Sequence, residues 1–131
     1  MKKILIIDDD IDMCLLLERF FKRNQFDVKI THSGKKGLEE LEKNPPDVIL
    51  CDEIGSSQDT QAILEAIHAG VSIVTSAHAL DVEDVCQRPN LHPLFTPPVF
   101  ERYILLSNRQ GAGTIEAILD SHRKPVGDLV C

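Results

Sequence analysis

The first half of the chain alternates short, continuous apolar runs with amphipathic stretches. Residues 4–7 are all branched aliphatic and lead directly into Asp8. Residues 48–51 form a second apolar run, which leads in the same way into Asp52. Continuous apolar runs of this length are typical of strands that are buried on both faces of a parallel sheet. The two runs therefore predict two central strands, each followed at once by an acid.

Two amphipathic stretches separate these runs and predict helices. Residues 11–21 carry apolar side chains at helical spacing, and residues 33–43 carry two leucines among lysines and glutamates. Between the helices, the alternation in residues 26–31 predicts another strand. The first 52 residues thus predict a βαβαβ order. The apolar positions that predict the first helix are Ile11, Leu15, Leu16, Phe20 and Phe21.

The second half continues this alternation and then changes character. Residues 60–69 predict a helix that ends at Gly70, residues 71–76 predict a buried strand, and residues 82–87 predict a short helix. Four prolines then interrupt regular structure between residues 89 and 98. Beyond them, two strand-like segments at 103–107 and 114–119 flank a glycine-rich turn. This pattern predicts a β-hairpin.

Successive βαβ units define the expected fold. Their crossovers are right-handed, and together they predict a flavodoxin-like three-layer α/β sandwich. We expect parallel strands in the order 2-1-3-4-5, with the antiparallel hairpin added near the C-terminal end. The chain has 131 residues, which suits one domain over residues 1–120. Residues 121–131 are expected to form a loosely ordered tail.

Charge and composition limit the classes of partner that we expect the chain to bind. The chain has 21 acidic and 14 basic residues and a net charge of −7, the opposite of the bias that binding to nucleic-acid phosphates requires. No apolar run approaches the roughly 20 residues of a membrane span. We therefore expect no nucleic-acid or membrane partner and a cytoplasmic location. Reduced thiols are expected at the four cysteines, which lack metal-ligand spacing: Cys14, Cys51, Cys86 and Cys131.

Three acids after the apolar runs fall at the same edge of the predicted sheet. Asp8 and Asp9 follow the first run, and Asp52 follows the second. In a parallel α/β sheet the carboxyl ends of neighbouring strands converge on one edge, where ligands bind. Carboxylates brought together repel one another unless a cation lies among them, and their oxygen atoms suit Mg²⁺. The alternative is that these acids cap helices and face water without a metal.

The same two motifs carry a family resemblance. The sequences ILIIDDD at residues 4–10 and DVILCD at residues 47–52 resemble the receiver domain of two-component response regulators, over residues 1–52. The resemblance implies that Asp8 and Asp9 hold Mg²⁺ and that Asp52 accepts a phosphoryl group from a histidine kinase. It also implies that the backbone carbonyl group of Ile54 completes the metal shell. A carboxylate can attack phosphorus only where a cation neutralises charge on both groups.

From Asp52 to about Asp120 the chain is similar to a different family, the stage III sporulation AA ATPases, which are related to secretion ATPases. In keeping with that family, the apolar run and Glu53 have the form of a Walker B strand, in which Asp52 would hold the Mg²⁺ of a nucleotide and Glu53 would activate water. The segments that carry the similarity are residues 52–55, 62–66, 69–71, 77–78, 99–103 and 113–118.

ATP hydrolysis also requires a loop that cradles the phosphates. The sequence contains no G-x-x-x-x-G-K-[ST] motif, and its nearest approach, residues 33–37, lacks both the spacing and the hydroxyl group. We therefore expect no ATPase activity, no role for Glu53 as a catalytic base, and no enzyme activity of the chain.

The receiver resemblance weakens after Asp52. Ser76 suits the hydroxyl position at the end of a fourth strand, although such a side chain also often bonds locally. Pro97 stands where a receiver has a lysine and supplies neither a charge nor a donor. The favoured hypothesis is a Mg²⁺-binding phosphoacceptor module, impaired by this proline. Two alternatives stay open: an engineered chimeric scaffold without biological activity, joined at Asp52, and a degenerate nucleotide-binding domain.

Overall fold

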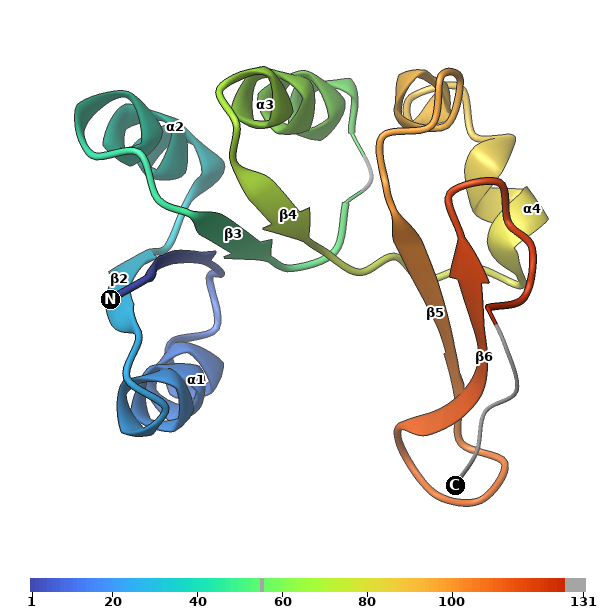
Figure 1. Ribbon diagram of the computed structural model, residues 1–131, viewed down its shortest axis with the longest axis horizontal. Helices are drawn as coiled ribbons and strands as arrows, with labels where there is room; N and C mark the ends of the chain where they lie inside the picture. Colours follow the sequence, from blue (N-terminus) through green and yellow to red (C-terminus); the bar gives the residue numbers. More distant parts are fainter. Residues whose placement is uncertain (55, 127–131) are drawn as a thin grey trace. The chain divides into compact units, whose positions relative to one another are not determined.

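A computed structural model of the protein describes residues 1–54 and 56–126. The chain divides into two compact units, Met1–His78 and Ala79–Cys131, the second of which is described as far as Val126 (Figure 1). The first unit has the βα alternation that the apolar runs predict. Its elements are β1 (Lys3–Ile7), α1 (Ile11–Arg23), β2 (Asp27–Thr31), α2 (Gly34–Lys43), β3 (Val48–Cys51), α3 (Ser57–His68) and β4 (Ser72–Val74).

The four strands of the first unit form one parallel sheet in the order β2-β1-β3-β4. This order confirms the first four positions of the predicted 2-1-3-4-5 sheet. In the central pair, Ile7 at the end of β1 lies opposite Cys51 at the end of β3. On the other side of β1, Ile7 lies opposite Thr31. Because the strands are parallel and in this register, the residues after β1 and β3 emerge side by side.

Helices cover both faces of the sheet, so that the first unit has three layers. α1 lies on one face, and α2 and α3 lie on the other (Figure 1). Successive side chains of a strand point to opposite faces. Ile4 and Ile6 therefore pack with Cys14 of α1, whereas Leu5 packs with Leu41 of α2 and other residues on the opposite side. This two-sided burial is why β1 is apolar at every position after Lys3.

The face that α1 turns to the sheet differs from the pattern that predicted the helix. Cys14 is buried, with Leu17 and Phe21 packed beside it. Of the five apolar positions named above, only Phe21 joins this cluster; the others are exposed, Phe20 at 59%. α1 is amphipathic, and its apolar arc is wider than the strip that packs on the sheet, so helical spacing alone does not select which apolar residues are buried. Within the described residues no helix, α1 included, is long and apolar enough to cross a membrane.

Within its described residues, the second unit contains the predicted hairpin but adds no fifth strand to the parallel sheet. Its elements are α4 (Val82–Cys86), a 3₁₀ helix η1 (His92–Leu94), β5 (Arg102–Ser107) and β6 (Thr114–Asp120). β5 and β6 pair antiparallel in a two-stranded sheet of their own. The segment that leads to Pro97, where the receiver resemblance would place the end of a fifth strand, contains η1 and a turn instead. Pro93, Pro97 and Pro98 explain this correction, because proline has no N–H group for a central ladder.

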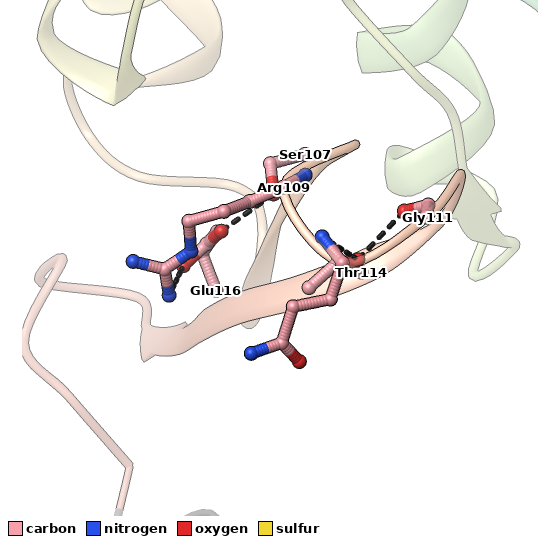
Figure 2. Close-up of polar contacts among 6 residues, drawn as sticks. Ser107, Arg109, Gly111, Thr114 and Glu116 are labelled. Carbon is pink, nitrogen blue, oxygen red and sulfur yellow. Dashed lines mark hydrogen bonds and ion pairs between the residues drawn. The ribbon is translucent and has the colours of Figure 1, made fainter.

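A polar network holds the turn of the hairpin (Figure 2). The hydroxyl group of Ser107 donates a hydrogen bond to Glu116, and the guanidinium group of Arg109 lies 2.8 Å from the other oxygen of that carboxylate. The hydroxyl group of Thr114 donates to the carbonyl oxygen of Gly111 at 2.6 Å. Gly111 has a positive φ of 111°, a conformation that favours glycine.

The chain after β6 turns back along the hairpin. The N–H group of Asp120 donates to the carbonyl oxygen of Lys124 at 2.8 Å, and that of Val126 donates to Ile118 at 2.9 Å. Residues 121–126, expected to belong to a loosely ordered tail, are therefore bonded to β6. The rest of that predicted tail, residues 127–131, lies outside the described residues.

Candidate functional site

The three acids singled out in the sequence lie together at the carboxyl edge of the parallel sheet. Carboxylate oxygens of Asp8, Asp9 and Asp52 are all within 4.8 Å of one another. The register of β1 and β3 explains this, because Ile7 and Cys51 are opposite each other and the acids follow directly. Asp8 is half-buried, whereas the other two are exposed. The cluster is therefore open to solvent on one side.

Hydrogen bonds fix Asp8 on three sides. Its N–H group donates to the carbonyl oxygen of Thr31 at 3.1 Å, which extends the ladder between β1 and β2. Its own carbonyl oxygen lies 3.0 Å from Nδ1 of His32, and since a carbonyl oxygen can only accept, Nδ1 is the donor. The carboxylate of Asp8 accepts the N–H group of Asp10 at 2.9 Å. Asp8 is thus held in place while part of its carboxylate remains available.

Asp52 is held through its backbone and leaves its side chain exposed. Its N–H group donates to the carbonyl oxygen of Ile7 at 3.3 Å. The hydroxyl group of Thr75, just after β4, donates to the carbonyl oxygen of Asp52 at 2.9 Å. Both neighbouring strands therefore fix the position of this residue, and its carboxylate extends to solvent.

The chemistry of this donor set suits a small, hard dication. Negative charges at such separations repel by about 1 kcal/mol per pair in water, and by more near a protein surface. Mg²⁺ prefers oxygen ligands and usually keeps several waters, which the open side of the cluster would admit. The neighbouring Asp10 has a different role, because its carboxylate accepts the N–H group of Met13 at 3.0 Å and caps α1.

The other two predicted site residues, Ile54 and Ser76, are joined to each other by a backbone hydrogen bond. Ile54 is buried, and its N–H group donates to the carbonyl oxygen of Ser76 at 2.9 Å, which ties the loop after β3 to the segment after β4. Ser76 itself is exposed. A metal contact from the Ile54 carbonyl group and a phosphoryl contact from the Ser76 hydroxyl group stay predictions. Gly55, which was part of the second family motif, lies outside the described residues.

The structure also shows the surroundings of Glu53 and Pro97, which the two family resemblances singled out. Glu53, the acid of the Walker B pattern, forms an ion pair of 3.9 Å with Nε2 of His78, and both side chains are largely exposed. This pair is charged only when the imidazole is protonated. Pro97 belongs to the second unit and follows a cis peptide bond after Thr96. As a proline it offers no charge and no donor.

A cavity of about 500 Å³ opens beside the acids, between α2 and α3, and no sequence pattern predicted it. Small residues line it from both helices, among them Gly37 on α2 and Ala62 and Ala66 on α3. The cavity reaches from the acidic edge to the apolar floor of the sheet. Its other lining residues include Ile7, Asp8, Asp9, Leu38, Leu41, Ile49, Cys51, Asp52, Glu53, Asp59, Ile63 and Ile73.

Two thiols near the acids are kept protonated. Burial raises the pKa of the Cys51 thiol, an effect that a hydrogen bond with Thr75 partly opposes. Burial likewise raises the pKa of Cys14, and the nearby charges of Asp8, Asp10 and Asp9 add to this shift. Both groups are therefore neutral at pH 7, and the reduced cysteines are poor nucleophiles.

Sequence reasoning missed His32 and Thr75 as residues that support the site. His32 bonds the carbonyl group of Asp8, and Thr75 bonds that of Asp52. Both residues come directly after edge strands, His32 after β2 and Thr75 after β4. A search for polar residues at the carboxyl ends of all four strands, rather than for acids alone, would have found them.

The first unit is a parallel α/β unit with a carboxylate cluster at the carboxyl edge of its sheet, the edge at which α/β domains bind ligands. The family described as sporulation stage III, protein AA, matches residues 38–126, from within α2 through the hairpin. The chain belongs to this family. The match begins earlier than Asp52, the position from which the sequence resemblance was traced.

The individual relatives include a protein of this family and two transcriptional regulatory proteins. Stage III sporulation protein AA of Bacillus subtilis is 47% identical over 75 residues, which is 57% of this chain and 24% of that protein. The transcriptional regulatory protein ZraR of Escherichia coli is 33% identical over 66 residues, half of this chain and 15% of that protein. PrrA of Mycobacterium bovis, also a transcriptional regulatory protein, is 32% identical over 79 residues, 60% of this chain and 30% of that protein. The chain thus spans less than a third of each of these relatives and combines a response-regulator likeness with its family.

A solved structure adds support for the fold. A fusion containing yeast Spc42 trimeric coiled-coil amino acids 181–211 has a TM-score of 0.54 at 21% identity, and the match covers 69% of this chain and 63% of the other. At that level of identity the likeness concerns the fold alone.

Proposed function

We propose that the first unit is a receiver-like phosphoacceptor module that binds Mg²⁺ through Asp8, Asp9 and Asp52. The observation that carries the proposal is the separation of at most 4.8 Å between carboxylate oxygens of these three residues. The likeness to the transcriptional regulatory proteins ZraR and PrrA supports the same assignment. The partner that this function requires is a histidine kinase.

Each acid has a distinct task in the proposed reaction. Asp8 and Asp9 supply oxygen ligands, and a carboxylate oxygen of Asp52 attacks phosphorus. The bond between phosphorus and the donor nitrogen of phosphohistidine breaks, and the imidazole leaves with the electron pair. When bound, Mg²⁺ supplies positive charge between the carboxylates and the phosphoryl oxygens. The module is a phosphoryl acceptor and has no catalytic turnover of its own.

The proposed module is impaired relative to a complete receiver. Pro97 aligns with the lysine of that family and can neutralise no phosphoryl oxygen. The Ser76 hydroxyl group is the one predicted donor for the phosphoryl group. We therefore propose that phosphorylation is slow.

A small-molecule phosphodonor with Mg²⁺ tests the proposal without a kinase. Intact-mass spectrometry should detect a gain of about 80 Da for one phosphoryl group. The gain should be lost in Asp52→Asn and retained in Asp27→Asn, a matched change at the start of β2, where the strands begin. A chain that gains no mass, or an Asp52→Asn variant that gains as much as the parent, contradicts the proposal.

The runner-up is a chimeric scaffold that folds but has no biological activity. The presence of two family likenesses in one short chain favours it. It predicts that neither phosphorylation nor Mg²⁺ binding occurs, whereas the phosphoacceptor proposal requires both. A degenerate nucleotide-binding domain predicts tight ATP binding instead, which a nucleotide titration detects.

A further inference from the structure

The cavity between α2 and α3 has the size and the walls of a small-molecule site. Its volume of about 500 Å³ falls within the roughly 300–1,000 Å³ of typical ligand pockets. Leu38 and Leu41 line it from α2, and Ile63 lines it from α3. Ile49 and Ile73 of the sheet form its apolar floor. An apolar group placed in this cavity would be removed from water on several sides.

The mouth of the same cavity is acidic. Its lining includes five carboxylates, of which Asp59 accepts the N–H group of Ser56 and Glu53 pairs with His78. The other three are the clustered acids at the carboxyl edge. Among the described residues that line the cavity, His32 is the one basic side chain, and its Nδ1–H bonds the carbonyl oxygen of Asp8. A cationic group is therefore favoured at the mouth, and an anionic one is repelled.

A buried hydroxyl group lies near Gly37, one of the residues that line the cavity. Oγ1 of Thr31 has no hydrogen-bond partner in the structure, and the residue is only 9% exposed. This oxygen would lie 3.5 Å from a Cβ atom on Gly37, which lines the cavity. Buried hydroxyl groups are usually satisfied. The Thr31 hydroxyl group is thus a buried group without a partner, and Thr31 is not among the residues that line the cavity.

We propose that this cavity binds a small organic amine with an apolar body. The ammonium group lies among Asp8, Asp9 and Asp52, and the hydrocarbon part extends between α2 and α3 over Ile49 and Ile73. Charge complementarity at the mouth and apolar walls behind it together select this class of ligand. The amine site shares the three carboxylates with the proposed phosphoacceptor function but does not depend on phosphorylation.

Three probes separate the two parts of the recognition. Hexylamine carries a charge and an apolar chain, methylamine carries the charge alone, and hexanol carries the chain alone. In amide chemical-shift titrations of the full chain, hexylamine should bind at least about tenfold more tightly than either of the others. Affinity should rise by roughly fourfold per buried methylene group from butylamine to hexylamine. Equal affinity for hexanol would overturn the role of the acids, and equal affinity for methylamine would overturn the role of the cavity.

Substituting leucine for either of two alanines tests where the amine binds. Ala62→Leu fills the cavity from α3, whereas Ala69→Leu adds the same bulk at the exposed end of that helix. Ala62→Leu should weaken hexylamine binding by at least about tenfold, and Ala69→Leu should leave it unchanged. If Ala62→Leu does not fold, Leu38→Ala serves instead, because a larger cavity should shift the preferred chain toward octylamine. Unchanged binding in the cavity variant that folds would place the amine elsewhere and overturn the proposal.

Mg²⁺ titrations distinguish failure of this inference from failure of the proposed function. Mg²⁺ should weaken hexylamine binding, because both cations neutralise the same carboxylates. Ala62→Leu should lose hexylamine binding but keep its response to Mg²⁺. Mg²⁺ binding without amine binding overturns only the amine site. Amine binding without any Mg²⁺ response supports the amine site and contradicts the proposed phosphoacceptor.

Discussion

The hydroxyl group of Thr75 donates a hydrogen bond of 2.9 Å to the backbone carbonyl oxygen of Asp52. Thr75 follows β4 and Asp52 follows β3, so that this bond continues the link between the two strands beyond their last paired residues. On its other side Asp52 is bonded to Ile7 of β1. The acid that we propose as the phosphoacceptor is therefore positioned by two strands, although its own side chain is exposed.

Replacing Thr75 with valine should loosen that arrangement. The change keeps the shape of the side chain but removes the donor, at a loss of about 1 kcal/mol in the free energy of unfolding. Weaker Mg²⁺ binding should follow, because the Asp52 carboxylate is no longer held beside Asp8. Denaturant unfolding and a Mg²⁺ titration measure the two effects. Thr75→Ser retains the hydroxyl group and should behave like the parent, and equal losses in both variants would contradict this role.

Removing one charge from the acidic cluster should have opposite effects with and without metal. Without Mg²⁺, Asp52→Asn should raise the free energy of unfolding by up to about 1 kcal/mol, because repulsion among the acids is relieved. With Mg²⁺ the parent should gain stability by mass action, and the variant should gain less. Thermal unfolding in both conditions measures the difference. The control is Asp27→Asn, at the start of β2, which should respond to Mg²⁺ as the parent does.

The central part of the fold and the acidic cluster could be predicted because they depend on local rules. An apolar run followed by an acid places that acid at the carboxyl edge of a buried parallel strand, and the same pattern occurs in β1 and β3. The hairpin could be predicted because its turn contains glycines such as Gly111 and Gly113, which have positive φ values.

Other features depend on how distant elements pack and have no local signal. The buried face of α1 includes Cys14 rather than Leu16 because the sheet beneath contacts only part of the wide apolar arc of this amphipathic helix. The cavity depends on the spacing between α2 and α3, and this spacing cannot be predicted from the sequence of either helix. The fifth strand was expected from the fold class, although the prolines at 93, 97 and 98 argued against a central strand there.

Two glycines of α2 should respond in opposite ways to the same substitution. A Cβ atom added at Gly37 would overlap the side chain of Ile7, whereas one added at Gly34 would meet no atom within 4 Å. Alanine is favoured over glycine in a helix by roughly 1 kcal/mol, but overpacking costs about 1–3 kcal/mol. We expect Gly37→Ala to lower the free energy of unfolding by up to about 2 kcal/mol, and Gly34→Ala to raise it slightly. Denaturant unfolding of the two variants measures this, and a stabilised Gly37→Ala would contradict the close contact.

The stability of the second unit should fall in acid through Asp120. Hydrogen bonds from the backbone N–H groups of Lys124 and His122 lower the pKa of this carboxyl below its ordinary value of 3.8. Because the folded-state pKa is the lower one, the stabilisation is present above pH 3.8 and is lost as the pH falls through the folded-state value. Asp120→Asn should reduce this acid dependence in denaturant unfolding measured across that range. An unchanged acid dependence in the variant would show that the carboxylate contributes nothing.

The most direct test of the proposed function is a Mg²⁺ titration of the full chain followed by amide chemical shifts. We predict saturable changes centred on Asp8, Asp9 and Asp52, with an affinity on the order of millimolar because the cluster is open to solvent. Asp52→Asn should abolish most of these changes. Shifts that are absent at saturating Mg²⁺, or that are centred away from the carboxyl edge of the sheet, would contradict the metal site and the phosphoacceptor function that depends on it.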